Sequence, residues 1–307
     1  MEDRPYAPEA NRTLTGLACA VPAYLIWGLN PIYFKALKSV PAFEILLHRI
    51  LWSFVLLMPV ILVQGRFHEF SQALRRKNIL IPLSASTLLV GFNWFLYIWA
   101  VNADHVLQTS LGYYINPLVN VLLGMVFLKE RLTRPQWVAV VLAAVGVANL
   151  LVFFGQLPWI SLGLAFSFGF YGLIRKTAPV GSVVGLAVET MLLALPALGV
   201  LVYLDSLGQG AFLRTGLRTN LLLMAAGLVT AVPLVLFTRG ARRLRLATMG
   251  FLQYIAPTCT FLLAVFLWKE PLSSIQLLTF VLIWIALAIY SADSAIAYRR
   301  LRRTKLQ

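Results

Sequence analysis

Two ionisable residues inside long apolar stretches are the strongest candidates for chemistry in this sequence. Arg49 lies eight residues past Pro41, and Glu189 follows Arg49 by 140 residues in a second apolar stretch. A charge within a membrane costs about 2.5–3.5 kcal/mol, so each group needs a partner or a water-filled cavity. We expect Arg49 and Glu189 to face a central cavity, where they would pair or hold a substrate's opposite charges. A structural ion pair, or side chains that reach separate membrane surfaces, would explain the same residues.

Glu44 and His48 form a second candidate pair. Their spacing of four residues places both side chains on one face of a helix. Because histidine titrates near neutral pH, the pair could act as a proton relay. A hydrogen-bonded structural pair is the alternative.

Aromatic and amide side chains form a third group. Amides inside a membrane must hydrogen-bond within the protein or face a polar cavity. We expect a substrate cavity whose lining, besides Arg49 and Glu189, includes Asn30, Asn93, Trp94, Tyr97, Tyr113, Asn116, Gln253 and Tyr254. Interhelical hydrogen bonds and an aromatic belt at the membrane surface are the alternative.

Prolines interrupt three of the apolar stretches. Pro117 and Pro257 are 140 residues apart, and Pro31 lies near the end of the first stretch. Each proline removes an amide that would bond the carbonyl four residues earlier. We expect these prolines to act as hinges beside the cavity, although simple packing kinks would produce the same pattern.

The elements that must position these residues are membrane-spanning helices. The chain has 307 residues, of which 60% are hydrophobic and 12% charged, and apolar stretches long enough to cross a bilayer follow one another. Period-two patterning is absent, which argues against a β-barrel. The sequence thus predicts an all-α polytopic membrane protein with ten transmembrane helices, at 14–34, 42–63, 79–99, 109–128, 136–154, 158–174, 183–204, 220–237, 248–268 and 275–293.

Basic residues predict the orientation of these helices. If the N-terminus is cytoplasmic, twenty Lys and Arg fall in cytoplasmic segments and five in outer segments. The positive-inside rule therefore places both the N-terminal tail (1–13) and the basic C-terminal tail (294–307) in the cytoplasm. Since the basic residues lie between apolar stretches, the net charge of +15 indicates membrane orientation, and no nucleic-acid partner is expected.

The chain also contains an internal repeat. Residues 109–132 reappear as residues 249–272, and a Lys-Glu pair ends both copies, at Lys129-Glu130 and at Lys269-Glu270. The repeat predicts two halves, 14–154 and 158–293, with five spans each. An odd number of spans reverses the second half, so the halves would be inverted repeats around a central site, as in transporters that work by alternating access.

Motifs for other functions are absent from the sequence. It has no Gly-x-Ser-x-Gly, no His-Glu-x-x-His and no phosphate-binding glycine loop. We therefore expect no enzyme activity, no cofactor and no metal site. The prediction is a secondary transporter that moves a small molecule through the lipid bilayer, with a proton as the candidate coupling ion. A non-transporting scaffold or an intramembrane enzyme is the alternative, and a homodimer is left open.

Six segments resemble the EamA-type transporters of the drug/metabolite transporter superfamily. The resemblance covers about residues 14–295, and the segments that carry it are Trp27-Gly28 with Pro31 and Lys35, residues 41–49 (PAFEILLHR), 93–102 (NWFLYIWAVN), 110–118 (SLGYYINPL), 164–173 (LAFSFGFYGL) and 253–258 (QYIAPT). It implies ten helices in two EamA repeats, a bacterial inner (plasma) membrane location, and export of small amino-acid-like or drug-like compounds.

Overall fold

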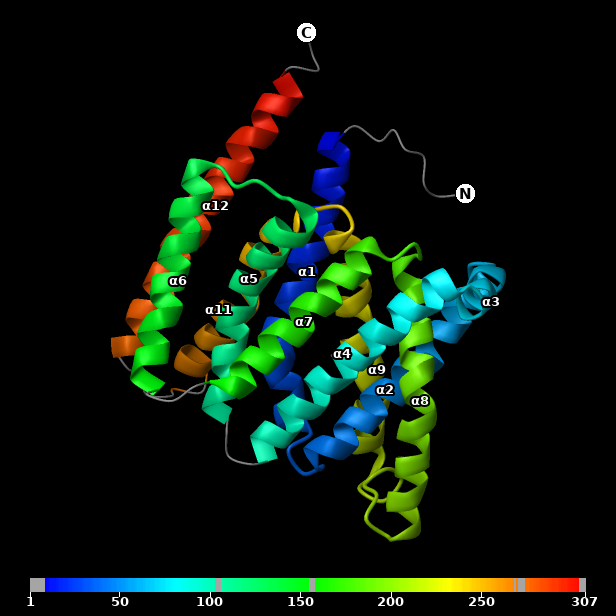
Figure 1. The fold of residues 1–307 in the computed structure, drawn as a ribbon. Coiled ribbons are helices and arrows are strands. Elements are labelled where there is room, and N and C mark those ends of the chain that lie inside the picture. The colour runs from blue at the N-terminus through cyan, green and yellow to red at the C-terminus, as the bar shows by residue number, and fades with distance from the viewer. Residues whose placement is uncertain (1–8, 103–105, 155–157, 268, 270–273, 304–307) are drawn as a thin grey trace.

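The chain folds into a bundle of helices (Figure 1). The computed structural model describes residues 9–102, 106–154, 158–267, 269 and 274–303, and within these ranges it contains no strand. In chain order the elements are α1 (Glu9–Ala36), α2 (Ala42–Val63), α3 (Phe67–Arg75), α4 (Lys77–Asn102), α5 (Val106–Leu128), α6 (Arg134–Phe154), α7 (Trp159–Thr177), α8 (Ser182–Ser206), α9 (Leu217–Ala241), α10 (Leu246–Gln253), α11 (Ile255–Leu262), the π-helical turn η1 (Leu263–Leu267) and α12 (Ser274–Arg303).

Each predicted span overlaps an observed helix, but the structure differs from the prediction in three places. The predicted span 248–268 is divided into α10, α11 and η1. The last helix continues to Arg303 instead of ending near 293, because alanine, isoleucine and arginine sustain a helix beyond the apolar part. The short helix α3 lies in a segment that the sequence prediction left as a loop.

Nine helical segments within the described residues are long and apolar enough to cross a membrane. The segment that fails this test is α7, which covers the predicted span 158–174. Glycine, serine and tyrosine dilute its apolar content, and two cations close it. Length and composition thus support a multi-pass membrane protein, and the tenth span remains a prediction.

Start positions of the helices repeat along the chain. Helices α2, α4, α5 and α6 begin 140 residues before α8, α9, α10 and α12, respectively. The residues after α5 and after η1 also match, because Lys129 and Lys269 both have left-handed backbone, with φ of 53° and 54°. The offset found in the sequence therefore recurs in the helix boundaries and in one backbone conformation.

Helices α2 and α8, which are related by this offset, pack antiparallel. Near the start of α2, the Glu44 side chain contacts the backbone at Ala211, just beyond the end of α8. Past the other end of α2, Arg66 lies against Gly181, which precedes α8. Equivalent positions in the two helices therefore lie at opposite ends of the bundle.

Helix α5 crosses α10 near the centre of the bundle. The Tyr254 hydroxyl donates a hydrogen bond of 3.2 Å to the carbonyl of Tyr114, its counterpart 140 residues earlier. A Cβ at Gly250 would lie 2.5 Å from the Pro117 carbonyl oxygen, so the approach requires glycine. Contact between matched residues is what a two-fold axis through this crossing would produce.

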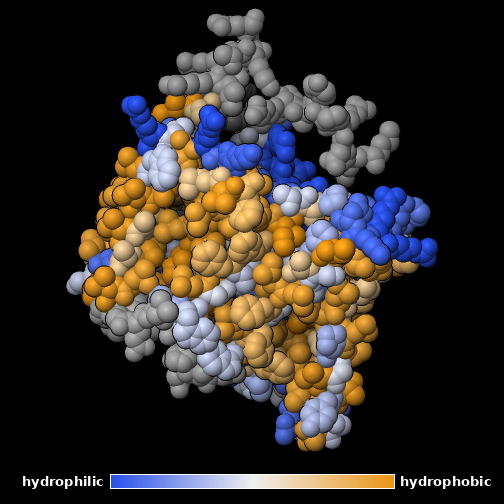
Figure 2. Space-filling view, viewed as in Figure 1, coloured by the Kyte–Doolittle hydropathy of each residue, from blue (hydrophilic) through white to orange (hydrophobic). Residues whose placement is uncertain are grey.

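Polar side chains gather at the two ends of the bundle. The start of α1 and the end of α12 lie together at one end, here called the terminal end (Figure 1). Figure 2 shows hydrophilic residues there, around α3 and at the tip of α8, with a hydrophobic surface between them. This distribution fits a chain that crosses a bilayer.

Candidate functional site

Arg49 lies among residues from five helices, in the half of the bundle away from the terminal end. It follows the start of α2 by seven residues. Its neighbours come from α1, α4, α5 and α9. We call this group the Arg49 site, and it consists of Tyr33, Phe34, Arg49, Trp94, Tyr97, Tyr113 and Thr230.

The Arg49 guanidinium is positioned by one hydroxyl and two rings. Its Nε donates a hydrogen bond of 2.9 Å to Thr230 Oγ1. Its central carbon lies 5.5 Å from the Phe34 ring centroid and 5.4 Å from that of Trp94. Both distances are in the range of cation–π attraction. The group is therefore held without any acidic partner in the described part of the chain.

Three tyrosines extend the Arg49 site towards the end of the bundle that lies away from the terminal end. Tyr33, Tyr97 and Tyr113 are close enough to interact electrostatically with the guanidinium. The Tyr97 and Tyr113 rings meet edge to face at 6.2 Å. Arg49 is only partly buried, and Tyr113 is 49% exposed. The site thus presents one cation and aromatic surface to an accessible region.

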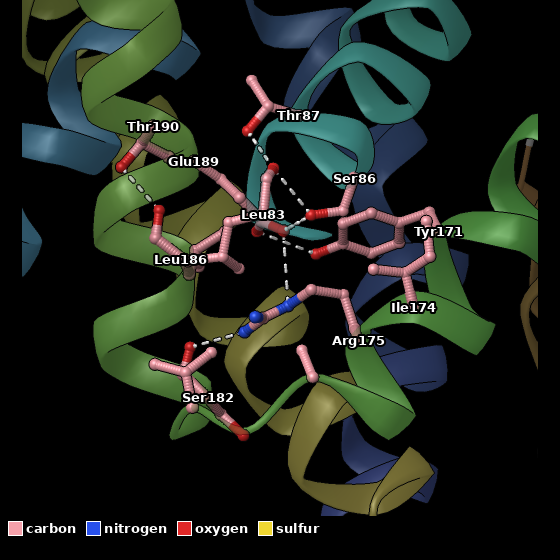
Figure 3. Close-up of polar contacts among 12 residues, drawn as sticks. Leu83, Ser86, Thr87, Tyr171, Ile174, Arg175, Ser182, Leu186, Glu189 and Thr190 are labelled. Carbon is pink, nitrogen blue, oxygen red and sulfur yellow. Dashed lines mark hydrogen bonds and ion pairs between the residues drawn. The ribbon is translucent and has the colours of Figure 1, made fainter. Parts of the chain in front are cut away.

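Glu189 belongs to a different cluster (Figure 3), near the start of α8 in the half of the bundle that contains the terminal end (Figure 1). It accepts hydrogen bonds from Ser86 and from Tyr171, and it forms an ion pair of 3.4 Å with Nε of Arg175. Nη2 of Arg175 donates to the Ser182 carbonyl at 3.1 Å. Arg175 is 0% and Glu189 1% exposed, so these opposite charges neutralise each other in the protein interior.

The prediction that Arg49 and Glu189 pair with each other is wrong in this structure. Arg175 takes Glu189, while Arg49 bonds Thr230. Each residue lies seven positions, or about 10 Å, from the start of its helix. Because α2 and α8 run antiparallel, those depths are measured from opposite ends of the bundle. The 140-residue offset therefore places Arg49 and Glu189 in opposite halves of the bundle, whereas Tyr114 and Tyr254, matched by the same offset, meet at the crossing of α5 and α10.

The Glu44–His48 pair is present but is also tied to the backbone. Glu44 Oε1 lies 3.8 Å from His48 Nε2, and the same oxygen accepts the amides of Ala211 and Phe212. The indole N–H of Trp52 donates to His48 Nδ1 at 3.2 Å. A neutral His48 would therefore carry its proton on Nε2, facing Glu44. A proton relay at this pair stays a prediction. Glu44 also has a structural role, because it binds the backbone of the segment after α8.

Several predicted lining residues bond to neighbouring helices instead of facing the Arg49 site. The buried amides of α5 connect it to α7 and α10: Asn116 donates to the Ala165 carbonyl, and Asn120 donates to Gln253 Oε1. Asn93 donates to the Leu164 carbonyl and to Ser167. Tyr254 is fully buried at the crossing of α5 and α10. These contacts match the interhelical alternative.

The three predicted hinge prolines differ in their surroundings. The break between α10 and α11 falls at Tyr254, three residues before Pro257. Because proline has no amide hydrogen, Pro257 cannot bond the carbonyl of Gln253, which lies next to this break. In contrast, Pro117 and Pro31 lie within continuous helices. Asn30 is partly buried beside Pro31. Only the second copy of the matched proline accompanies a helix break.

Between the Arg49 site and the terminal end, the described residues are held by packed rings and hydrogen bonds. Rings of α1, α7 and α9 pack together around Phe237, with centroids 5.3–6.2 Å apart. Nearer the end, Glu130 accepts the first amides of α10, from Leu246 at 2.6 Å and Ala247 at 3.0 Å. Its counterpart, Glu270, lies outside the described residues. The first half of the chain is thus bonded to the second at this end.

Sequence reasoning missed the three side chains that contact Glu189, which are Ser86, Tyr171 and Arg175. It also missed Tyr33, Phe34 and Thr230 of the Arg49 site. Arg175 directly follows the predicted span 158–174, so the sequence places it in a cytoplasmic segment, although it is fully buried in the structure. Tyr33 and Phe34 follow Pro31 at the end of the first span. Thr230 is one of many hydroxyls in apolar stretches, and no local pattern marks it. Only Arg175 had a usable signal, since Glu189 required a cation.

Comparisons with known proteins agree with this architecture. The EamA-like transporter family matches residues 14–152. The chain is 49% identical to Protein RarD of Salmonella typhi, over 95% of this chain and 99% of that protein. It is 50% identical to an uncharacterized transporter of Pseudomonas aeruginosa, over 94% and 96%. A solved crystal structure with 20% identity shares the fold with a TM-score of 0.68, over 95% of this chain and 98% of that chain.

Identity near one half over almost the full length of both chains is enough to assign a family. The relatives are described as RarD proteins or as transporters. The chain therefore belongs to the RarD family of EamA-like membrane transporters.

Proposed function

We propose that this transporter exports small amino-acid-like or amphipathic metabolites across the bacterial inner membrane by alternating access. In this proposal ten helices form two inverted repeats, 14–154 and 158–293, and both tails are cytoplasmic. Support comes from the distribution of basic residues, the repeated helix starts and the contact between Tyr114 and Tyr254. Resemblance to drug/metabolite transporters supports the direction of transport.

One observation carries the proposal: Arg49 is a partly exposed cation inside a spanning helix, without an acidic partner among the described residues. An unpaired charge is too costly to leave in lipid, so its exposed part faces water between the helices. A small polar substrate can replace that water. Aromatic residues around it would contact the rest of the substrate.

The arrangement corresponds to one state of a transport cycle. The Arg49 site has exposed residues, while the terminal end is closed by the rings around Phe237 and by the bonds of Glu130. With cytoplasmic termini, this state is open to the outside. Exchange of conformation between two inverted halves would close the outer end and open the inner one.

A proton is the proposed coupling ion, and Glu44 with His48 is the proposed carrier. Both side chains are buried and 3.8 Å apart. On the same helix, His48 directly precedes Arg49 and Glu44 lies five residues before it, so a change in their charge would act on the site electrostatically.

Flux measurements in proteoliposomes test this function. Labelled amino acids and amphipathic compounds are offered with and without a proton gradient, to wild type, to Arg49→Gln and to Arg239→Gln as a matched control on an exposed arginine. We expect flux of at least one compound by wild type and by the control, and loss of that flux in Arg49→Gln. No flux under either condition would contradict transport, and normal flux by Arg49→Gln would contradict the site.

A further inference from the structure

The guanidinium of Arg49 has an open side. Its Nε is engaged by Thr230, and Nη1 and Nη2 have no hydrogen-bond partner among the side chains and backbone of the described residues. If Nη1 and Nη2 were fully buried, they would be buried polar atoms without a hydrogen-bond partner. They are not, so part of their surface is accessible. Two parallel N–H groups of an arginine match the two oxygens of a carboxylate.

No acidic residue of the described chain balances the charge of Arg49. Within the described spanning helices the buried acids are Glu44 and Glu189. Glu44 accepts two backbone amides beyond α8, and Glu189 pairs with Arg175. Neither carboxylate is available at the Arg49 site. As far as the described residues form it, the site is therefore electropositive and suited to an anion.

The lack of an available carboxylate among the described residues also disfavours a zwitterionic ligand. An α-amino acid that places its carboxylate on Arg49 also brings an ammonium group to within a few ångströms of the guanidinium. No carboxylate from the described residues lies there to receive that group. Removal of the ammonium from water is then not compensated by an opposite charge, and the two cations repel each other.

Exposed aromatic rings next to Nη1 and Nη2 of Arg49 indicate the chemistry of the rest of the ligand. Tyr113 is 49% exposed and meets Tyr97 edge to face, and Trp94 forms the other wall at the guanidinium. Aromatic rings in such positions favour a planar or aromatic partner in offset or edge contact. A short aliphatic anion would leave this surface without contact.

From these observations we infer that the ligand of the Arg49 site is an aromatic monocarboxylate that lacks an ammonium group. This inference rests on the proposed transport function and narrows its substrate class. The carboxylate would be held by Nη1 and Nη2 of Arg49, with Thr230 fixing the guanidinium, and the ring would lie against Trp94, Tyr97 and Tyr113.

Competition binding to the purified full-length protein tests the inference. Labelled 3-phenylpropanoate is the probe, and its competitors share the phenyl ring but differ in charge: unlabelled 3-phenylpropanoate, neutral 3-phenylpropanamide, zwitterionic phenylalanine and cationic 3-phenylpropylamine. We expect each of the last three to compete roughly tenfold less well or worse. Propanoate, which has the charge without the ring, should also compete poorly.

Variants show whether binding occurs at the intended place. Arg49→Gln should lose the probe, and Arg49→Lys, which keeps the charge without the fork, should bind it about tenfold more weakly. Arg239→Gln should bind like wild type. Thermal unfolding of each variant shows that loss of binding is not loss of fold.

Several results would overturn the inference. They are the absence of probe binding to wild type, competition by phenylalanine equal to that of 3-phenylpropanoate, and unchanged binding by Arg49→Gln. The flux panel decides the transport function separately, because it includes amino acids and amphipathic compounds. Flux of an amino acid that depends on Arg49 would refute the ligand class and support the transporter.

Discussion

Two arginines in the helices of this transporter have opposite surroundings. Arg175 is fully buried, lies 3.4 Å from Glu189 and bonds the Ser182 carbonyl. Arg49 is partly exposed and is held by a neutral hydroxyl and two rings. Once paired, a buried charge has no remaining field to offer a ligand, whereas a cation without a counter-charge attracts one. Arg175 is thus part of the architecture, whereas Arg49 is the residue that we propose for substrate recognition.

The largest expected effect is on stability, at the Arg175 cluster. Glu189→Ala leaves Arg175 buried without its counter-charge, which should lower the free energy of unfolding by about 3–5 kcal/mol. Unfolding of the purified protein in denaturant measures this loss. Replacement of both partners, Arg175→Met with Glu189→Leu, should recover most of it. A stable Glu189→Ala protein would show that water or another group already neutralises Arg175.

Arg49→Gln is the matching change at the other arginine, and its effect should fall on transport. Loss of a charge-assisted bond of about 1.5–3 kcal/mol should lower kcat/KM for the transported anion about tenfold to a hundredfold. The free energy of unfolding should change by less than about 1 kcal/mol, because no ion pair is broken. Flux and unfolding must therefore be measured on the same preparation. A large loss of stability with proportionate loss of flux would make Arg49 a structural residue.

A pair of glycines in α8 tests how tightly Arg175 is enclosed. A Cβ at Gly185 would lie 2.1 Å from Arg175 Nη1, whereas a Cβ at Gly199 meets nothing within 4 Å. Gly185→Ala should thus destabilise the protein by about 1–3 kcal/mol. Gly199→Ala, at an open position of the same helix, should be neutral or stabilise by up to about 1 kcal/mol. Equal melting temperatures for the two variants would indicate that Arg175 can move aside at little cost.

The contrast also explains what the sequence could predict. Long apolar stretches and their 140-residue repeat locate the helices, because both are local or periodic signals. Arg49 is found by its charge in an apolar segment, and Trp94, Tyr97 and Tyr113 by their aromatic character. All four belong to one site in the structure.

Partners across helices were harder to predict. Arg175, near the end of α7, and Glu189 of α8 come together because both helices pack against α4, whose Ser86 also bonds Glu189. The expected pairing of Arg49 with Glu189 failed because α2 and α8 run antiparallel, which puts these two matched positions near opposite ends of the bundle. Thr230 depends on the approach of α9 to α2, for which no single residue gives a signal.

The smallest expected effect concerns the one hydroxyl that orients Arg49. Thr230→Val keeps the shape of the side chain and removes the acceptor of Nε, at a cost of about 1 kcal/mol in substrate binding. We expect KM to rise about fivefold with little change in kcat, since ground state and transition state lose the same contact. Thr238→Val is the matched control: this threonine is buried on the same helix, and it does not contact Arg49. It should leave KM unchanged. If both variants raise KM equally, the effect belongs to the packing of α9, and the guanidinium is oriented by its two rings alone.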